Sequence, residues 1–128
     1  MAELKELLQK DDWKNEKHVP VLGVRKWEKG MVEIEATVGK EIPHPNKTEH
    51  HIEYIKILFL PDGEKFPYLV GDHEFSAHGA SVKGPDTSTI YCEPHVIALF
   101  KTEKSGTVLV ESYCNIHGLW TNEIRLDL

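Results

Sequence analysis

Short runs of strand-forming residues, each ended by turn residues, recur along most of this chain. The clearest run is MVEIEATV at residues 31–38, where Val32, Ile34, Ala36 and Val38 alternate with polar side chains. A period of two places the apolar side chains on one face of a β-strand and the polar ones on the other. The pattern therefore predicts a half-buried strand at residues 31–38.

Seven other segments have strand composition, and Gly, Pro, Asp and Ser residues separate many of them. Short strands at this spacing predict an all-β fold, an antiparallel β-sandwich. Residues 3–10 (ELKELLQK) instead have leucines at helical spacing and predict a short N-terminal helical segment. The remaining strands are expected at Val19–Lys26, His51–Leu60, Phe66–Phe75, Thr89–Cys92, Val96–Lys101, Thr107–Tyr113 and Asn122–Leu126.

The chain is expected to be one domain, residues 1–128, because it has neither repeats nor a linker-like change in composition. Its 15 basic and 21 acidic residues argue against a nucleic-acid surface. It lacks the long apolar run of a membrane helix, and its charged N-terminus is unlike a signal peptide. We therefore expect no membrane association and a cytoplasmic location, with Cys92 and Cys114 reduced.

Three segments place metal-binding side chains beside residues that restrict or relax the backbone. Prolines on both sides hold the backbone at His44, and the run ends in His50 and His51. Adjacent strand residues point to opposite faces, so at most one of that pair should reach a given metal. In CNIHG, Cys114 and His117 are three residues apart in a predicted turn and can converge on one ion. The third segment is EKHVP, which contains His18.

A mixed set of imidazoles and a thiolate suits iron, copper or zinc and excludes magnesium and calcium. If four histidines and one cysteine bind together, five positions are filled and one stays open, which favours iron over tetrahedral zinc. Two alternatives remain at this point. A blue-copper electron carrier would need a weak axial ligand, commonly methionine, but the chain has only Met1 and Met31. A metal-free immunoglobulin-like binding module would leave the histidine clustering unexplained.

The stretches EKHVP, GKEIPHPNKTEHH and SYCNIHGLW resemble the signatures of the superoxide reductases, in particular the one-centre, neelaredoxin-type members of the desulfoferrodoxin family. The resemblance runs from about Trp13 to the end and includes FSAHGASVKGP at residues 75–85. The cysteines that bind the extra N-terminal iron of two-centre relatives are absent. Lys47 is a small departure, because the family commonly has a small polar residue there.

This resemblance implies an immunoglobulin-like β-sandwich and one iron ion per chain (Fe2+/Fe3+). Cys114 would be the axial ligand, and Glu16 would occupy the sixth position in the oxidised state. Lys17 would lie beside Glu16 on the same loop. The implied equatorial ligands are His18, His44, His50 and His117.

The implied reaction is the one-electron reduction of superoxide to hydrogen peroxide without release of oxygen. The resemblance also implies a rubredoxin-like electron donor and a homotetramer. We expect no metal role for the other histidines, and we expect Trp120 to shield part of the site. Those other histidines are His51, His73, His78 and His95.

Overall fold

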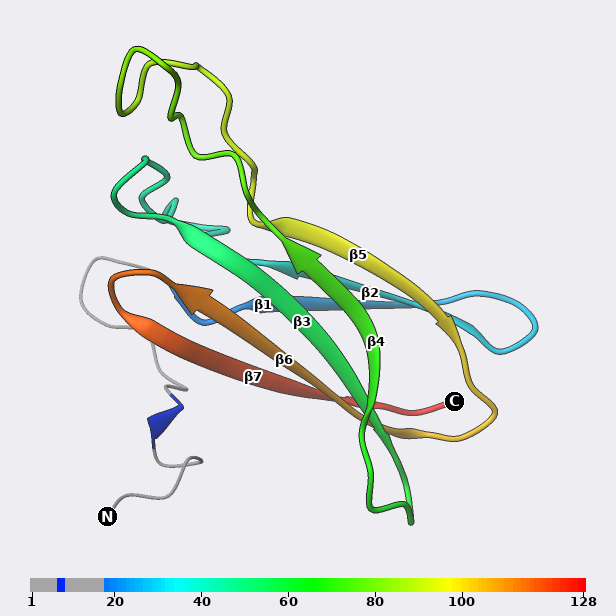
Figure 1. Ribbon diagram of the computed structural model, residues 1–128. Coiled ribbons are helices and arrows are strands. Elements are labelled where there is room, and N and C mark those ends of the chain that lie inside the picture. Colours follow the sequence, from blue (N-terminus) through cyan, green and yellow to red (C-terminus); the bar gives the residue numbers. More distant parts are fainter. Residues whose placement is uncertain (1–6, 9–17) are drawn as a thin grey trace.

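The computed structural model describes residues 7–8 and 18–128, and seven strands within residues 18–128 form two antiparallel sheets packed face to face (Figure 1). The predicted β-sandwich is therefore confirmed. Most of the predicted helical segment, residues 3–10, lies outside the described residues, as do Glu16 and Lys17. The strands are β1 (Val21–Lys26), β2 (Met31–Thr37), β3 (Ile52–Pro61), β4 (Tyr68–Glu74), β5 (His95–Lys101), β6 (Gly106–Cys114) and β7 (Gly118–Leu126).

One sheet has three strands in the order β1-β2-β5, and the other has four in the order β4-β3-β6-β7. The predicted alternation of β2 is confirmed, because Val32, Ile34 and Ala36 are fully buried. In β6 the inward series continues from Val110 through Ser112 to Cys114. The hydrophobic core lies between these two inner faces. Cys114, the last residue of β6, belongs to this core and lies at one end of the sandwich.

One predicted strand is wrong. Residues 89–92 form no strand, and Tyr91 makes only an isolated bridge with His78. Thr89 has a φ of 65°, which is incompatible with an extended β-strand. These residues belong instead to the long connection between β4 and β5, which projects beyond the sheets at the upper left of Figure 1.

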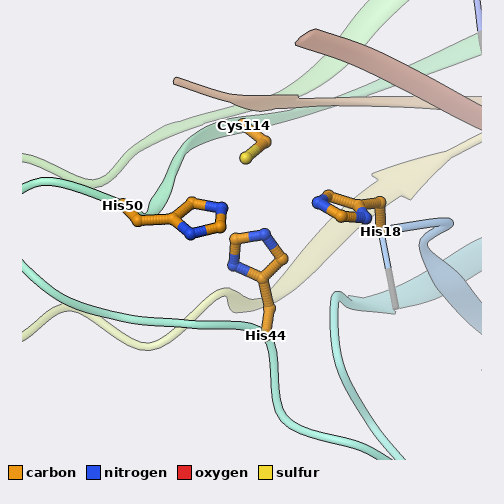
Figure 2. Close-up of side chains that lie close together, drawn as sticks. All are labelled: His18, His44, His50 and Cys114. Atoms are coloured by element: carbon orange, nitrogen blue, oxygen red, sulfur yellow. The ribbon is translucent and has the colours of Figure 1, made fainter. Parts of the chain in front are cut away.

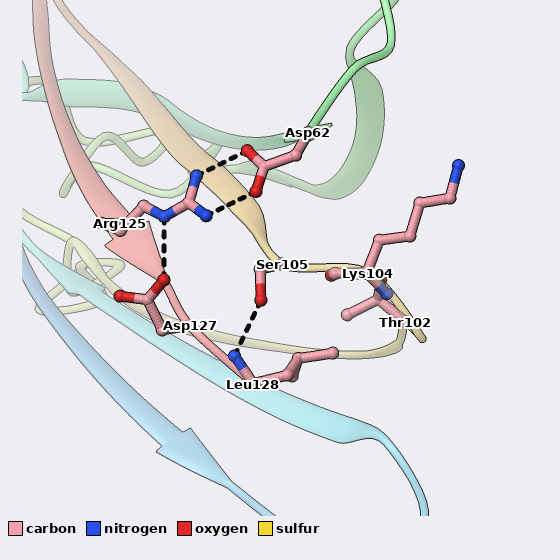
Figure 3. A network of polar contacts seen from close by, with 7 residues as sticks. All are labelled: Asp62, Thr102, Lys104, Ser105, Arg125, Asp127 and Leu128. Carbon is pink, nitrogen blue, oxygen red and sulfur yellow. Dashed lines mark hydrogen bonds and ion pairs between the residues drawn. The ribbon is translucent and has the colours of Figure 1, made fainter.

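Two features distinguish the ends of the sandwich. At one end, the register of β3 against β6 shifts between Ile52 and Tyr54, so the pairing is irregular in the first residues of β3. At the other end, Arg125 donates hydrogen bonds to both carboxylate oxygens of Asp62, and Ser105 accepts one from the Leu128 amide (Figure 3). These contacts join the end of β7 to the β3–β4 and β5–β6 connections.

In the part of the chain that the structure describes, no helix combines the length and hydropathy that crossing a membrane requires.

Candidate metal centre

Three separate segments meet at the end of the sandwich where β3 begins and β6 ends. His18 precedes β1, and His44 and His50 lie in the connection between β2 and β3. Cys114 is the last residue of β6. Because β3 and β6 are antiparallel neighbours, with Ile52 paired with Cys114, the start of one strand and the end of the other lie side by side. The predicted convergence of the three segments therefore follows from the sheet topology.

Four side chains at this end point toward one common space (Figure 2). One ligand atom from each of His18, His44, His50 and Cys114 lies within 4.8 Å of every other. Within residues 7–8 and 18–128, this is the one group of three or more His, Cys, Asp or Glu side chains gathered closely enough for a metal ion. His18, His44 and Cys114 are buried, whereas His50 is half-buried.

His117, the fifth predicted ligand, completes a ring of imidazoles. The ring centroids are 4.6 Å apart for His18 and His44, and 4.9 Å apart for His44 and His50. They are 5.1 Å apart for His50 and His117, and 4.9 Å apart for His117 and His18. Each imidazole thus has two of the other three as neighbours, edge to face. His44 lies across the ring from His117, and His18 from His50.

The nitrogen atoms that face the ring have the spacing of ligands on one ion. His18 Nε2 and His117 Nδ1 are 3.2 Å apart, and Cys114 Sγ is 3.9 Å from the same Nδ1. Two nitrogens bound to one metal at about 2.1 Å and at right angles would be about 3 Å apart. His117 therefore faces the centre through Nδ1 and His18 through Nε2.

His44 has a fixed tautomer that leaves one nitrogen available as a ligand. Its Nδ1 donates a hydrogen bond to the Pro45 carbonyl at 2.6 Å, so the lone pair is on Nε2. That Nε2 is buried and has no hydrogen-bond partner among the described residues. Burial lowers the pKa of His44 from 6.5 to about 4, against the opposing effect of the Pro45 carbonyl. The neighbouring histidines contribute a smaller part of this lowering of the pKa. At neutral pH the ring is therefore uncharged, as metal binding requires.

Cys114 and His117 are held by a tight turn between β6 and β7. Cys114 pairs with Gly118 across the turn, and Gly118 has a φ of 83°, a conformation that glycine adopts without steric cost. The amide of His117 donates to Cys114 Sγ at 3.3 Å. Such a donor favours the ionised thiolate over the thiol. The side chains of Cys114 and His117 thus lie close together, as their i, i+3 spacing predicted.

His18 is held by contacts with the four-stranded sheet. Trp120 stacks on its ring with a centroid distance of 4.5 Å and an angle of 14° between planes. The Ser112 hydroxyl donates to the His18 carbonyl at 3.3 Å, and Asn122 Nδ2 donates to the Pro20 carbonyl at 2.9 Å. Trp120, which the sequence suggested as a shield, therefore covers one face of this imidazole.

The other histidines lie away from the group. Of the adjacent pair, His50 joins the metal-binding group and His51 does not, as predicted; His51 stacks on His78 with ring centroids 3.4 Å apart. His95 is exposed and lies 3.3 Å from a Glu35 carboxylate oxygen. The His51–His78 stack was not predicted, because nothing in the spacing of residues 51 and 78 indicates that their loops meet.

Comparisons with known proteins give one consistent family. The family model described as desulfoferrodoxin matches residues 10–123. Superoxide reductase of Pyrococcus furiosus is 54% identical over 124 residues, covering 97% of this chain and 99% of that protein. Neelaredoxin of Megalodesulfovibrio gigas is 43% identical over 125 residues, covering 96% of each chain.

The solved structures agree with the relatives. A crystal structure of superoxide reductase in the oxidised state superimposes with a TM-score of 0.94 at 54% identity, over 98% of this chain and all of that one (100%). The Archaeoglobus fulgidus superoxide reductase (neelaredoxin) in the reduced form gives a TM-score of 0.89 at 59% identity, over 95% and 99% of the two chains.

Proposed function

Because the chain belongs to the desulfoferrodoxin family and is a superoxide reductase, we propose that it reduces superoxide at one iron ion held by four imidazoles and one thiolate. The proposed ligands are His18, His44, His50, His117 and Cys114. The observation that carries the proposal is the closed ring of imidazoles beside the Cys114 sulfur.

The donor set fits iron. Imidazole and thiolate ligands are unsuited to magnesium and calcium, which bind oxygen. Structural zinc takes four ligands in a tetrahedron, whereas five donors face this centre. The buried lone pair of His44 Nε2 supports a metal in particular, because an unpartnered buried polar atom costs about 1–3 kcal/mol. When bound, the iron supplies the electron that superoxide takes up and regains it from a donor protein.

The side chains of the chain have separate roles in this proposal. The Cys114 thiolate would be one of the ligands of the metal and would donate electron density to it. Lys17 provides local positive charge that attracts the superoxide anion to a chain whose net charge is −6. Glu16 would be a further ligand of the iron in the oxidised state and would be released in the reduced state. The reduction consumes one electron and two protons and yields hydrogen peroxide.

We take residues 1–128 to form one domain with one iron ion, and we propose a rubredoxin-like donor and a homotetramer on the strength of the family resemblance. The proposed location is the cytoplasm. Cys92 and Cys114 are both free thiols, which fits a reducing compartment.

The test combines metal analysis with product analysis. Protein purified from iron-supplemented cells is expected to contain one iron per chain. The reduced protein is expected to convert superoxide into an equal molar amount of peroxide without evolving oxygen. Copper or zinc in place of iron, or release of oxygen during turnover, would contradict the proposal.

A further inference from the structure

Asn115, the residue between the proposed axial cysteine and Ile116, bonds to the backbone on both sides of His50. Its side-chain Oδ1 accepts a hydrogen bond from the His51 amide at 2.9 Å. Its Nδ2 donates to the Glu49 carbonyl at 2.9 Å. In addition, its own amide donates to the His51 carbonyl at 3.2 Å. Asn115 therefore makes three hydrogen bonds with the backbone of Glu49 and His51, the residues on either side of His50.

These bonds extend the β3–β6 pairing beyond the point where it stops. The last paired residues are Ile52 and Cys114, and the register shifts immediately after Ile52. Before Ile52, the backbone of His50 forms two local hydrogen bonds with the backbone of Lys47, at 2.8 and 3.1 Å. Asn115 is thus the connection between this local turn and the strand that carries Cys114.

The residue type matters because both ends of the amide are used. An asparagine side chain offers one acceptor and two donors, whereas aspartate offers acceptors only and alanine neither. The acceptor end fixes the amide that follows His50, and the donor end fixes the carbonyl that precedes it. The imidazole of His50, which is only half-buried, thereby acquires a defined position relative to the sulfur.

We propose that Asn115 is a positioning residue that sets the placement of His50 relative to Cys114, and so tunes both metal affinity and the thiolate–metal interaction. This inference rests on the proposed function, because it assumes that His50 and Cys114 share one iron. Asn115 itself does not contact the metal or the substrate in this proposal.

The experiment compares Asn115→Ala and Asn115→Asp with the control Thr102→Ala. Thr102 also makes two side-chain hydrogen bonds, both to Lys104, at 2.8 and 3.0 Å. It lies in the β5–β6 connection, roughly 25 Å from Cys114 along β6. Iron affinity is measured by chelator competition, the thiolate–iron absorption band by spectroscopy, and the stability of the metal-free proteins by thermal unfolding.

We expect Asn115→Ala to weaken iron binding by about 10- to 100-fold, as loss of an outer partner of a metal ligand usually does. The absorption band should also shift. Asn115→Asp keeps the acceptor and should fall between Asn115→Ala and wild type, and it decides the question if Asn115→Ala does not fold. Thr102→Ala should lose a similar amount of thermal stability but keep wild-type iron affinity and absorption.

Wild-type affinity and spectrum in the folded Asn115 variants would overturn the inference, as would an equal loss of affinity in Thr102→Ala. A wild-type protein that binds no iron would instead overturn the proposed function, so the two failures are distinguishable.

Discussion

Replacing Cys114 with serine tests the proposed axial ligand most directly. Cys114 is fully buried, and its sulfur is one of the four atoms that lie within 4.8 Å of one another. The change substitutes oxygen for sulfur and leaves the rest of the residue unchanged. A serine hydroxyl does not ionise near neutral pH, whereas a cysteine thiol has an ordinary pKa of about 8.5 that a metal lowers further. The variant should therefore lose the thiolate and retain the fold.

The stability cost can be estimated from the burial of residue 114. A buried hydroxyl without full compensation costs about 1–3 kcal/mol. The His117 amide, which now donates to the sulfur at 3.3 Å, remains as a partner for the new oxygen and limits the cost. For a chain of 128 residues, each kcal/mol corresponds to about 4 °C in the melting temperature. We therefore expect the metal-free variant to melt about 4–12 °C below the metal-free wild type.

Function should change far more than stability. Cys114→Ser should lose the thiolate-to-iron absorption band and most of the superoxide reductase activity. Its iron affinity should fall by at least the 10- to 100-fold that loss of an outer partner causes. The matched control is Cys92→Ser, which alters a half-buried thiol outside the metal-binding group and should keep band, affinity and activity. Retention of the band and of activity in Cys114→Ser would refute the axial assignment.

Three further predictions concern charge and protons around the centre. Lys17→Ala should slow the encounter with superoxide and flatten its dependence on ionic strength, measured by pulse radiolysis; an unchanged salt profile would exclude steering by Lys17. Glu16→Ala should leave the first fast reduction almost unchanged, since the open ferrous site does not use Glu16; a large loss in that step would make it essential to the chemistry. In the metal-free protein, the unfolded chain takes up a proton at His44 as the pH falls below 6.5, whereas the folded chain does so only near pH 4. The free energy of unfolding should therefore fall by about 1–3 kcal/mol across that range. Urea denaturation of the wild type and His44→Gln measures this loss, which the variant should largely lack.

Local sequence patterns were sufficient to predict the parts of the fold that depend on alternation. The inner face of β2 follows from period two, and the same rule predicted that only one residue of the pair His50 and His51 would join the metal-binding group. The strand predicted at residues 89–92 failed because its residues have strand composition but lie in a connection where Thr89 adopts a positive φ. Composition reports on side chains and does not determine that backbone angle.

The candidate ligands could be identified from sequence, but the contacts that hold them could not. Prolines beside His44 and a glycine after His117 are local signals, and they pointed to the segments that converge. The hydrogen bonds between Asn115 and residues 49 and 51 join positions that are 66 and 64 residues apart in the chain. Such contacts arise only once β3 and β6 have paired, so no pattern within one segment predicts them.

Three of the four proposed equatorial ligands are each held by a different non-ligand group, and this bears on how the site binds its metal. Trp120 packs on His18, the Pro45 carbonyl fixes the tautomer of His44, and Asn115 brackets His50. Because protein contacts hold these side chains independently, binding a metal need order little of the surrounding chain, and less of the binding energy is lost to conformational entropy. Because these imidazoles are held in place, we do not expect them to move into the position proposed for superoxide. With five proposed ligands held in this way, one position on the iron would remain for exchange between Glu16 and the substrate, which the proposed reaction requires.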